Sequence, residues 1–237
     1  MSRVWPDDLG SRDPAPPSRR LLLGELSALV EWPRGLLRMP TRGLPRGDGH
    51  PVMVIPGFGA DDHATWPLRR ALARLGYDVH GWEQGRNLGM RRAIGRALDD
   101  RIRELAETGG PVSLIGWSLG GVFARELARG RPDAVRRVIT LGSPIGHHPH
   151  ANNMERLFRL ANPRHTGEID WDGFTRREVA PPVPCVAIYS PRDGIVAARC
   201  CQERPGPNTE NVAVDGSHMA LVANRRVLRA IAERLPR

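Results

Sequence analysis

The stretch that most constrains the fold of this chain is Gly116-Trp-Ser-Leu-Gly120, which follows the apolar run 112–115 and precedes a helix-forming segment. A serine with glycines at this spacing, between a strand and a helix, is typical of a sharp turn that projects the serine hydroxyl above a sheet. We expect glycine at both positions because side chains there would collide with the serine. The helix that follows would direct free N–H groups and the positive end of its dipole toward Ser118. The stretch therefore predicts a nucleophilic serine.

Apolar strands and helices alternate along most of the chain. The alternation predicts an α/β fold with a mostly parallel sheet that has helices on both faces. At 237 residues, one sizeable domain is expected. The predicted strands are 52–55, 77–82, 112–115, 135–141, 185–189 and 211–214, and the predicted helices are 66–75, 89–108, the one after Ser118 and a last one ending at Leu235.

We expect an N-terminal part, residues 1–50, and a catalytic domain, residues 51–237. Residues 19–39 are amphipathic and predict two short helices broken at Pro33. Two interpretations stay open for them. The helices pack against the domain, or they make a weak contact with a membrane surface, because leucine, tryptophan and arginine dominate the segment.

Residues 145–184 interrupt the alternation and are too long for an ordinary connection. Such insertions usually cover a site, so we predict a lid-like insertion. Three of its four histidines cluster at 147, 148 and 150. Adjacent histidines broken by a proline do not share a face, and no carboxylate or cysteine lies at ligand spacing. We therefore expect no metal, and no cofactor-binding motif is visible either.

A serine hydroxyl needs a base, and the base needs an acid that orients it. In a fold of this kind both should come after the serine, in the order acid and then histidine, at the ends of later strands. Asp193 follows the predicted strand 185–189, and His218 follows the predicted strand 211–214. Each is next to glycine-containing turn sequence, which favours a position at the mouth of the sheet. Asp193 has one alternative reading, as the cap of a helix over 196–201.

From Val52 to the C-terminus these motifs resemble those of the α/β-hydrolase superfamily, of the serine esterase or lipase type. The resemblance implies Ser118 as nucleophile, His218 as general base and acid, and Asp193 as the residue that orients the histidine. It also implies an oxyanion hole made by the backbone N–H groups of Leu119 and Phe58. The loop that contains Phe58, Pro-Gly-Phe-Gly, departs from the His-Gly form common in the superfamily and keeps only the glycines.

The implied activity is hydrolysis of a carboxylic ester through an acyl-enzyme, with a small-molecule or lipid ester as substrate. An acyltransferase would use the same residues with an alcohol in place of water. A non-catalytic binding scaffold usually has a broken triad, whereas this triad is intact. Three further residues are candidates for substrate binding. Trp117 could instead pack in the core, and Arg86 and Asn87 could instead shape their turn.

The formal charge is +9, and every one of the 35 basic residues is an arginine. The arginines are spread over all predicted helices and form no patch with interleaved aromatic residues, so we expect no nucleic-acid partner. The sequence Ser18-Arg-Arg-Leu-Leu-Leu23 is similar to a twin-arginine export signal. Glu25 and Glu31 interrupt the stretch after this motif, and no small-residue cleavage site is evident. The expected location is therefore the cytoplasm. The three cysteines, at 185, 200 and 201, have no metal-site spacing, and we expect them to be inert.

Overall fold

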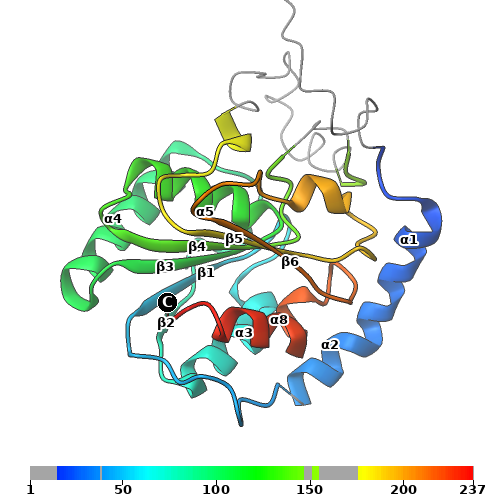
Figure 1. The fold of residues 1–237 in the computed structure, drawn as a ribbon, viewed down its shortest axis with the longest axis horizontal. Coiled ribbons are helices and arrows are strands. Elements are labelled where there is room, and N and C mark those ends of the chain that lie inside the picture. The colour runs from blue at the N-terminus through cyan, green and yellow to red at the C-terminus, as the bar shows by residue number, and fades with distance from the viewer. Residues whose placement is uncertain (1–14, 38, 147–150, 155–175, 237) are drawn as a thin grey trace, which may run out of the picture.

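A six-stranded sheet forms the centre of the molecule in a computed structural model that describes residues 15–37, 39–146, 151–154 and 176–236. Its strand order is β2-β1-β3-β4-β5-β6, and every neighbouring pair is parallel. The expected α/β class and parallel sheet are confirmed (Figure 1). The strands are β1 (Pro51–Ile55), β2 (Asp78–His80), β3 (Val112–Trp117), β4 (Val135–Leu141), β5 (Cys185–Tyr189) and β6 (Thr209–Ala213).

Helices cover both faces of the sheet (Figure 1). On one face α3 (Asp62–Leu75) and α8 (Arg225–Ala232) pack against Val52 and Val54 of β1. On the other face α4 (Arg92–Gly109) and α5 (Leu119–Gly130) pack against Met53 and Ile55 of the same strand. Successive strand residues point to opposite faces, so a strand buried on both sides is apolar throughout. This explains why β1 is a continuous apolar run.

Two helices begin at different residues from those expected. Helix α3 begins at Asp62 rather than at residue 66, because the Asp61 side chain caps it by accepting a hydrogen bond of 3.0 Å from the His63 N–H. Helix α4 begins at Arg92 rather than at residue 89. Gly89 has φ +117°, a backbone conformation that cannot belong to a right-handed helix. Apolar periodicity did not locate either start because both depend on local backbone chemistry.

The N-terminal segment is helical, but its break is not where Pro33 predicts it. Helix α1 (Arg19–Gly24) leads through the 3₁₀ turn η1 (Glu25–Ser27) into α2 (Ala28–Leu37), and Pro33 lies inside α2. The prediction of a break at Pro33 is therefore wrong. An internal proline costs a helix about 3 kcal/mol, which packing must offset. Here Gly35 packs against Ala223 so closely that an added Cβ would lie 2.1 Å from the Ala223 carbonyl oxygen.

The predicted insertion 145–184 can be followed only at its ends. Residues 147–150, with the three histidines, and 155–175 lie outside the described residues, so the lid remains a prediction. At one end, Asn153 and Ala151 exchange backbone hydrogen bonds with Ile195 and Ala197. The division at residue 50 also remains a prediction. Among the helices of the described ranges, none combines the length and apolarity needed to cross a bilayer.

Candidate active site

Ser118 lies in a strained turn between β3 and α5. Its backbone has φ +53° and ψ −121°, outside the regions that residues with a side chain ordinarily adopt. Such a conformation costs of order 1–3 kcal/mol and persists only where the surroundings enforce it. The Ser118 N–H donates to the Leu141 carbonyl at 2.8 Å, and its own carbonyl accepts from the Gly121 N–H at 3.0 Å. The turn is therefore held by β4 on one side and by α5 on the other.

The two glycines that flank the serine are required by close backbone contacts. A Cβ on Gly116 would lie 2.3 Å from the Cα of Gly121 in α5, and a Cβ on Gly120 would lie 2.3 Å from the Ile55 carbonyl oxygen in β1. The collisions are therefore with neighbouring elements rather than with the serine. Gly57, after β1, is also close, since its Cβ would lie 3.1 Å from the Cβ of Ser118. Glycine lets α5 start directly above the sheet.

His218 and Asp193 meet at the carboxyl ends of β6 and β5. His218 Nδ1 lies 2.6 Å from Asp193 Oδ2, and each residue is only 2% exposed. The other carboxylate oxygen, Oδ1, accepts from the N–H groups of Ile195 and Val196, both at 2.8 Å. Asp193 thus holds its own loop with one oxygen and the histidine with the other. The alternative reading of Asp193 as a helix cap is wrong, because the 3₁₀ turn η3 (Ala198–Cys201) has Ala197 as its N-cap residue and no side-chain cap.

The electrostatics favour a histidine that can be protonated. Burial by itself lowers the pKa of His218, but the charge and hydrogen bond of Asp193, with a smaller contribution from the charge of Glu25, raise it above the usual histidine value. With Asp193 ionised, Nδ1 carries the hydrogen and Nε2 is left as the acceptor. This is the tautomer that a general base needs.

Trp117 links the serine turn to the histidine. Its indole Nε1 donates to the His218 carbonyl at 3.2 Å, and the two ring centroids are 6.0 Å apart. Gly142, at the end of β4, packs against the same pair, since a Cβ there would lie 3.0 Å from His218 Nδ1 and 3.1 Å from Asp193 Oδ2. The structure therefore brings Ser118, His218 and Asp193 to one edge of the sheet.

The three substrate-binding candidates differ in their surroundings. Trp117 is 4% exposed and belongs to the core cluster on the α3 face. This burial favours the interpretation that Trp117 packs in the core. Asn87 is fully buried and its Nδ2 donates to the Pro56 carbonyl at 2.7 Å, while its Oδ1 accepts from the Gly89 N–H at 3.1 Å. These contacts favour the turn-shaping interpretation for Asn87. Arg86 is exposed and remains a candidate for substrate contact.

The two backbone groups expected to form an oxyanion hole come from the residue after the serine and from the loop after β1, whose Gly57 approaches the Ser118 side chain. Leu119 is the first residue of α5, where N–H groups have no acceptor within the helix. Phe58 belongs to the loop after β1, and the Asn87 side chain donates a hydrogen bond to the Pro56 carbonyl of this loop. The main chain of this loop is further tied by the bond from the Gly59 N–H to the Asn87 carbonyl, at 2.7 Å. The role of both groups remains a prediction.

Sequence reasoning missed a second Ser-His-Asp arrangement at the opposite end of the sheet. His50 Nε2 lies 2.8 Å from Ser113 Oγ, and His50 Nδ1 is hydrogen-bonded to Asp48. Ser113 is fully buried and His50 is 6% exposed. Burial lowers the pKa of His50 in spite of Asp48, whereas the pKa of His218 is raised. Ser113 lies near the amino end of β3, so its bond to His50 attaches the loop before β1 to the sheet.

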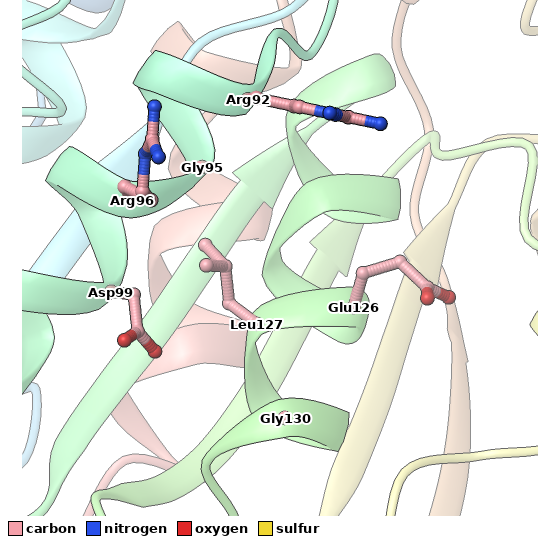
Figure 2. A pocket seen from close by; sticks show the side chains of 7 residues that line it. All are labelled: Arg92, Gly95, Arg96, Asp99, Glu126, Leu127 and Gly130. Atoms are coloured by element: carbon pink, nitrogen blue, oxygen red, sulfur yellow. The ribbon is translucent and has the colours of Figure 1, made fainter.

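An open groove of about 450 Å³ lies between α4 and α5, separate from the site. Figure 2 shows the residues that line it. Arginines from α4 and carboxylates from both helices line it. Its α5 side begins at Glu126, eight residues after Ser118, or about 12 Å along a helix. Its lining is mixed in charge and contains neither a histidine nor a serine. The lining residues are Arg92, Gly95, Arg96, Asp99, Glu126, Leu127 and Gly130.

Among the described residues, the remaining candidate ligands form no metal site. Within the described ranges, no group of three or more histidine, cysteine, aspartate or glutamate side chains is arranged to hold a metal ion. The three cysteines are buried and unpaired. Burial raises the pKa of Cys185 and of Cys200 to about 12, so both are protonated and unreactive at neutral pH.

Comparison with known proteins places the fold. No protein-family model matches the sequence, and no curated protein matches it. Among solved structures, a monoacylglycerol lipase from Paleococcus ferrophilus aligns with a TM-score of 0.59 at 17% identity, over 81% of this chain and 96% of the other. A soluble variant of monoglyceride lipase from Saccharomyces cerevisiae, in complex with a substrate analog, aligns with a TM-score of 0.56 at 16% identity, over 81% and 88%.

A third structure is MGS-MChE2, an α/β hydrolase enzyme from a sediment metagenome of the Mar Chica lagoon in Morocco. It aligns with a TM-score of 0.52 at 16% identity, over 80% of this chain and 91% of its own. At these identities the similarity concerns the fold alone. This chain has the α/β-hydrolase fold.

Proposed function

We propose that this protein hydrolyses carboxylic esters through an acyl-enzyme formed on Ser118. The observation that carries the proposal is the buried hydrogen bond between His218 and Asp193 at the strand ends next to the strained serine turn. A serine on such a turn, a histidine of raised pKa and a buried carboxylate behind it are the parts that acyl transfer requires. The fold shared with two lipases and a further hydrolase is consistent with this chemistry.

In the proposed reaction His218 Nε2 takes the hydroxyl proton of Ser118 while the serine oxygen attacks the ester carbonyl. The N–H groups of Leu119 and Phe58 stabilise the negative charge on the carbonyl oxygen. The intermediate collapses, and His218 returns the proton to the departing alcohol. Water then repeats the sequence on the acyl-enzyme and releases the acid. Asp193 keeps the Nε2 atom available throughout by binding the Nδ1 hydrogen.

A chain-length series of p-nitrophenyl esters tests the proposal. Ser118→Ala should lower turnover by about three orders of magnitude or more. The chain offers a matched control in Ser113→Ala, which removes a serine hydroxyl that is also bonded to a histidine, at the other end of the sheet. This control should keep its kcat. Equal loss in both variants, or an inactive wild type on every ester, would contradict the proposal.

Hydrolysis and acyl transfer share the acyl-enzyme and differ in what attacks it. Turnover in the presence of an added alcohol separates them. We expect free acid as the main product. A new ester as the main product at millimolar alcohol would instead assign the acyltransferase function, with the same residues in the same roles.

We further propose that the substrate is presented at a lipid surface, on which α1, η1 and α2 dock. The carboxylates of Glu25 and Glu31 point inward, and five apolar side chains of the segment are exposed, which is the reverse of an ordinary surface helix. Leu23, Leu26 and Leu29 are 67%, 63% and 75% exposed. Leu22 and Val30 are exposed beside them, and Arg19, Arg20 and Arg34 are exposed on the same segment. Leucines flanked by arginines are suited to an anionic membrane surface.

Sedimentation with phospholipid vesicles tests the docking surface. The wild type should bind vesicles that contain anionic lipid more strongly than neutral ones. Replacing Leu23, Leu26 and Leu29 together by serine should abolish binding and lower activity on an emulsified ester, while activity on soluble p-nitrophenyl acetate stays unchanged. Unchanged binding by the variant would contradict the proposal. A wild-type dimer that the variant converts to a monomer would show that the occupant of this face is a second copy of the chain.

A further inference from the structure

Glu25, in the η1 turn, lies outside the part of the chain that resembles a hydrolase and yet contacts both loops of the proposed acid and base. Its Oε1 accepts hydrogen bonds from the backbone N–H groups of Gly194, at 2.8 Å, and His218, at 2.9 Å. Its Oε2 accepts from the Met219 N–H at 3.0 Å. One carboxylate therefore joins the residue after Asp193 to the histidine itself.

The rest of the segment fixes the position of this carboxylate. The Leu21 carbonyl lies so close to Gly194 that a Cβ on the glycine would be 2.3 Å from its oxygen. One turn further along, Glu31 Oε2 accepts from the N–H and the hydroxyl of Ser217, at 3.2 and 3.3 Å. The Ser27 hydroxyl is hydrogen-bonded to the other oxygen of Glu31. These contacts on either side of Glu25 make it part of a packed interface between the segment and the two loops.

The bonds supply what the loops lack on their own. Backbone N–H groups at a buried loop end need an acceptor, and an ionised acceptor makes the stronger bond. The Asp193 and His218 loops come after different strands, β5 and β6, and are joined directly by the 2.6 Å bond between the two side chains. A displacement of 1 Å between reacting groups can lower a rate about 100-fold. A second connection, through main chain, would limit such a displacement.

We propose that Glu25 is a positioning residue for this reaction, which joins the Asp193 loop to the His218 loop and holds the histidine in place. The proposal rests on the proposed function, since it assigns His218 as the base. In this role Glu25 does not touch the substrate. It acts through His218, by accepting the His218 N–H and by adding a negative charge near the imidazole. The N-terminal segment is then a working part of the active site as well as the proposed docking surface.

Kinetics of Glu25→Gln and Glu25→Ala on a soluble short-chain ester test the proposal. We expect kcat to fall about 10- to 100-fold with little change in KM. Gln should retain more activity than Ala, because an amide oxygen in the place of Oε1 still accepts from the Gly194 and His218 N–H groups, and only the bond from the Met219 N–H is lost. The acidic limb of the kcat/KM profile should move to lower pH, because the Glu25 charge contributes to raising the pKa of His218. Glu107→Gln, an exposed carboxylate on α4, is the matched control and should behave as wild type.

Titration of the histidine imidazoles by NMR gives a readout that needs no turnover. The His218 resonance, assigned with His218→Gln, should titrate at lower pH in Glu25→Gln than in wild type. An unchanged titration, or an unchanged kcat, overturns the role of Glu25 even if the variant is less stable, because the residue would then only attach the segment. Failure of the proposed function appears differently, as a wild type with no esterase activity. Glu25→Gln keeps the size of the side chain, so it decides the matter if Glu25→Ala does not fold.

Discussion

At the scale of single residues, Ser118 is only partly buried and has a backbone conformation that its own side chain disfavours. The positive φ is enforced by backbone bonds to β4 and α5, so the rest of the fold bears the strain. Glu83 is the one other non-glycine residue with a positive φ among those described. Strain that concentrates at the candidate nucleophile is consistent with a functional role.

A first prediction concerns this strain. Ser118→Gly should be more stable than Ser118→Ala by about 1 kcal/mol, because glycine adopts the turn without steric cost. Both variants lack the hydroxyl and should be equally inactive, so the difference reports the backbone alone. Urea unfolding of the two proteins measures it. A Gly variant less stable than the Ala variant would show that the turn is unstrained.

The pH dependence provides a second prediction. If His218 acts as a base it must be neutral, so kcat/KM should rise with pH through its raised pKa, with the midpoint above the usual value of about 6.5. In Asp193→Asn the negative charge is lost, and the acidic limb should move to lower pH while kcat falls by about three to four orders of magnitude. A limb that stays in place would mean that another group controls it. A pH–rate profile of the two proteins measures both effects.

At the scale of elements, α5 starts directly against β1, and this close approach depends on Gly120. A Cβ at this position would meet the backbone of Ile55, which cannot move without disturbing the sheet. Gly130, at the other end of the same helix, has open space around its Cβ position. Gly120 thus has no room for a side chain whereas Gly130 has, and the sequence alone does not distinguish these two glycines of α5.

A third prediction rests on this difference. Gly120→Ala should destabilise the protein by about 3 kcal/mol or more and reduce esterase activity, because α5 and the serine turn must shift. Gly130→Ala should leave activity unchanged and raise stability by up to about 1 kcal/mol, since alanine favours a helix. Thermal unfolding and ester turnover of both variants provide the comparison. Equal stability of the two variants would contradict the structure of the turn.

At the scale of the whole molecule, a buried ion pair connects α5 to the chain beyond the sheet. Arg125 in α5 is 1% exposed, pairs with Glu203, which is 3% exposed, and donates from Nη2 to the carbonyls of Arg177 and Val179. Burial raises the pKa of Glu203, and the charge of Arg125 opposes that rise. Arg125 therefore connects α5, the helix that follows the serine, to Glu203 and to the described C-terminal end of the predicted insertion.

The fourth prediction concerns this pair. Arg125→Met or Glu203→Leu alone should cost about 3–5 kcal/mol, because each leaves a buried charge without its partner. The double variant should cost much less than the sum of the single changes. Denaturant unfolding of the wild type, the two single variants and the double variant measures the coupling. Additive losses would show that the two residues do not interact in solution.

Much of the site could be predicted because its signals are local. The order of Ser118, Asp193 and His218, each just after a strand, can be seen in the chain because a strand end and a glycine turn occupy few residues. Helix starts were less predictable, since the Asp61 cap and the positive φ of Gly89 leave no apolar pattern. The break expected at Pro33 is absent, because the packing of α2 outweighs the cost of the proline.

The sequence by itself determined the α/β class, the parallel sheet and the sharp turn at Ser118, because periodicity and glycine spacing are patterns of neighbouring residues. Only the tertiary structure decided which residues support the site. Glu25 meets His218 across 193 residues, and Ser113 meets His50 at the wrong end of the sheet for catalysis. Asn87 proved to hold a loop through the Pro56 carbonyl, 31 residues away. Such contacts depend on how the elements pack, and a single sequence contains no local record of them.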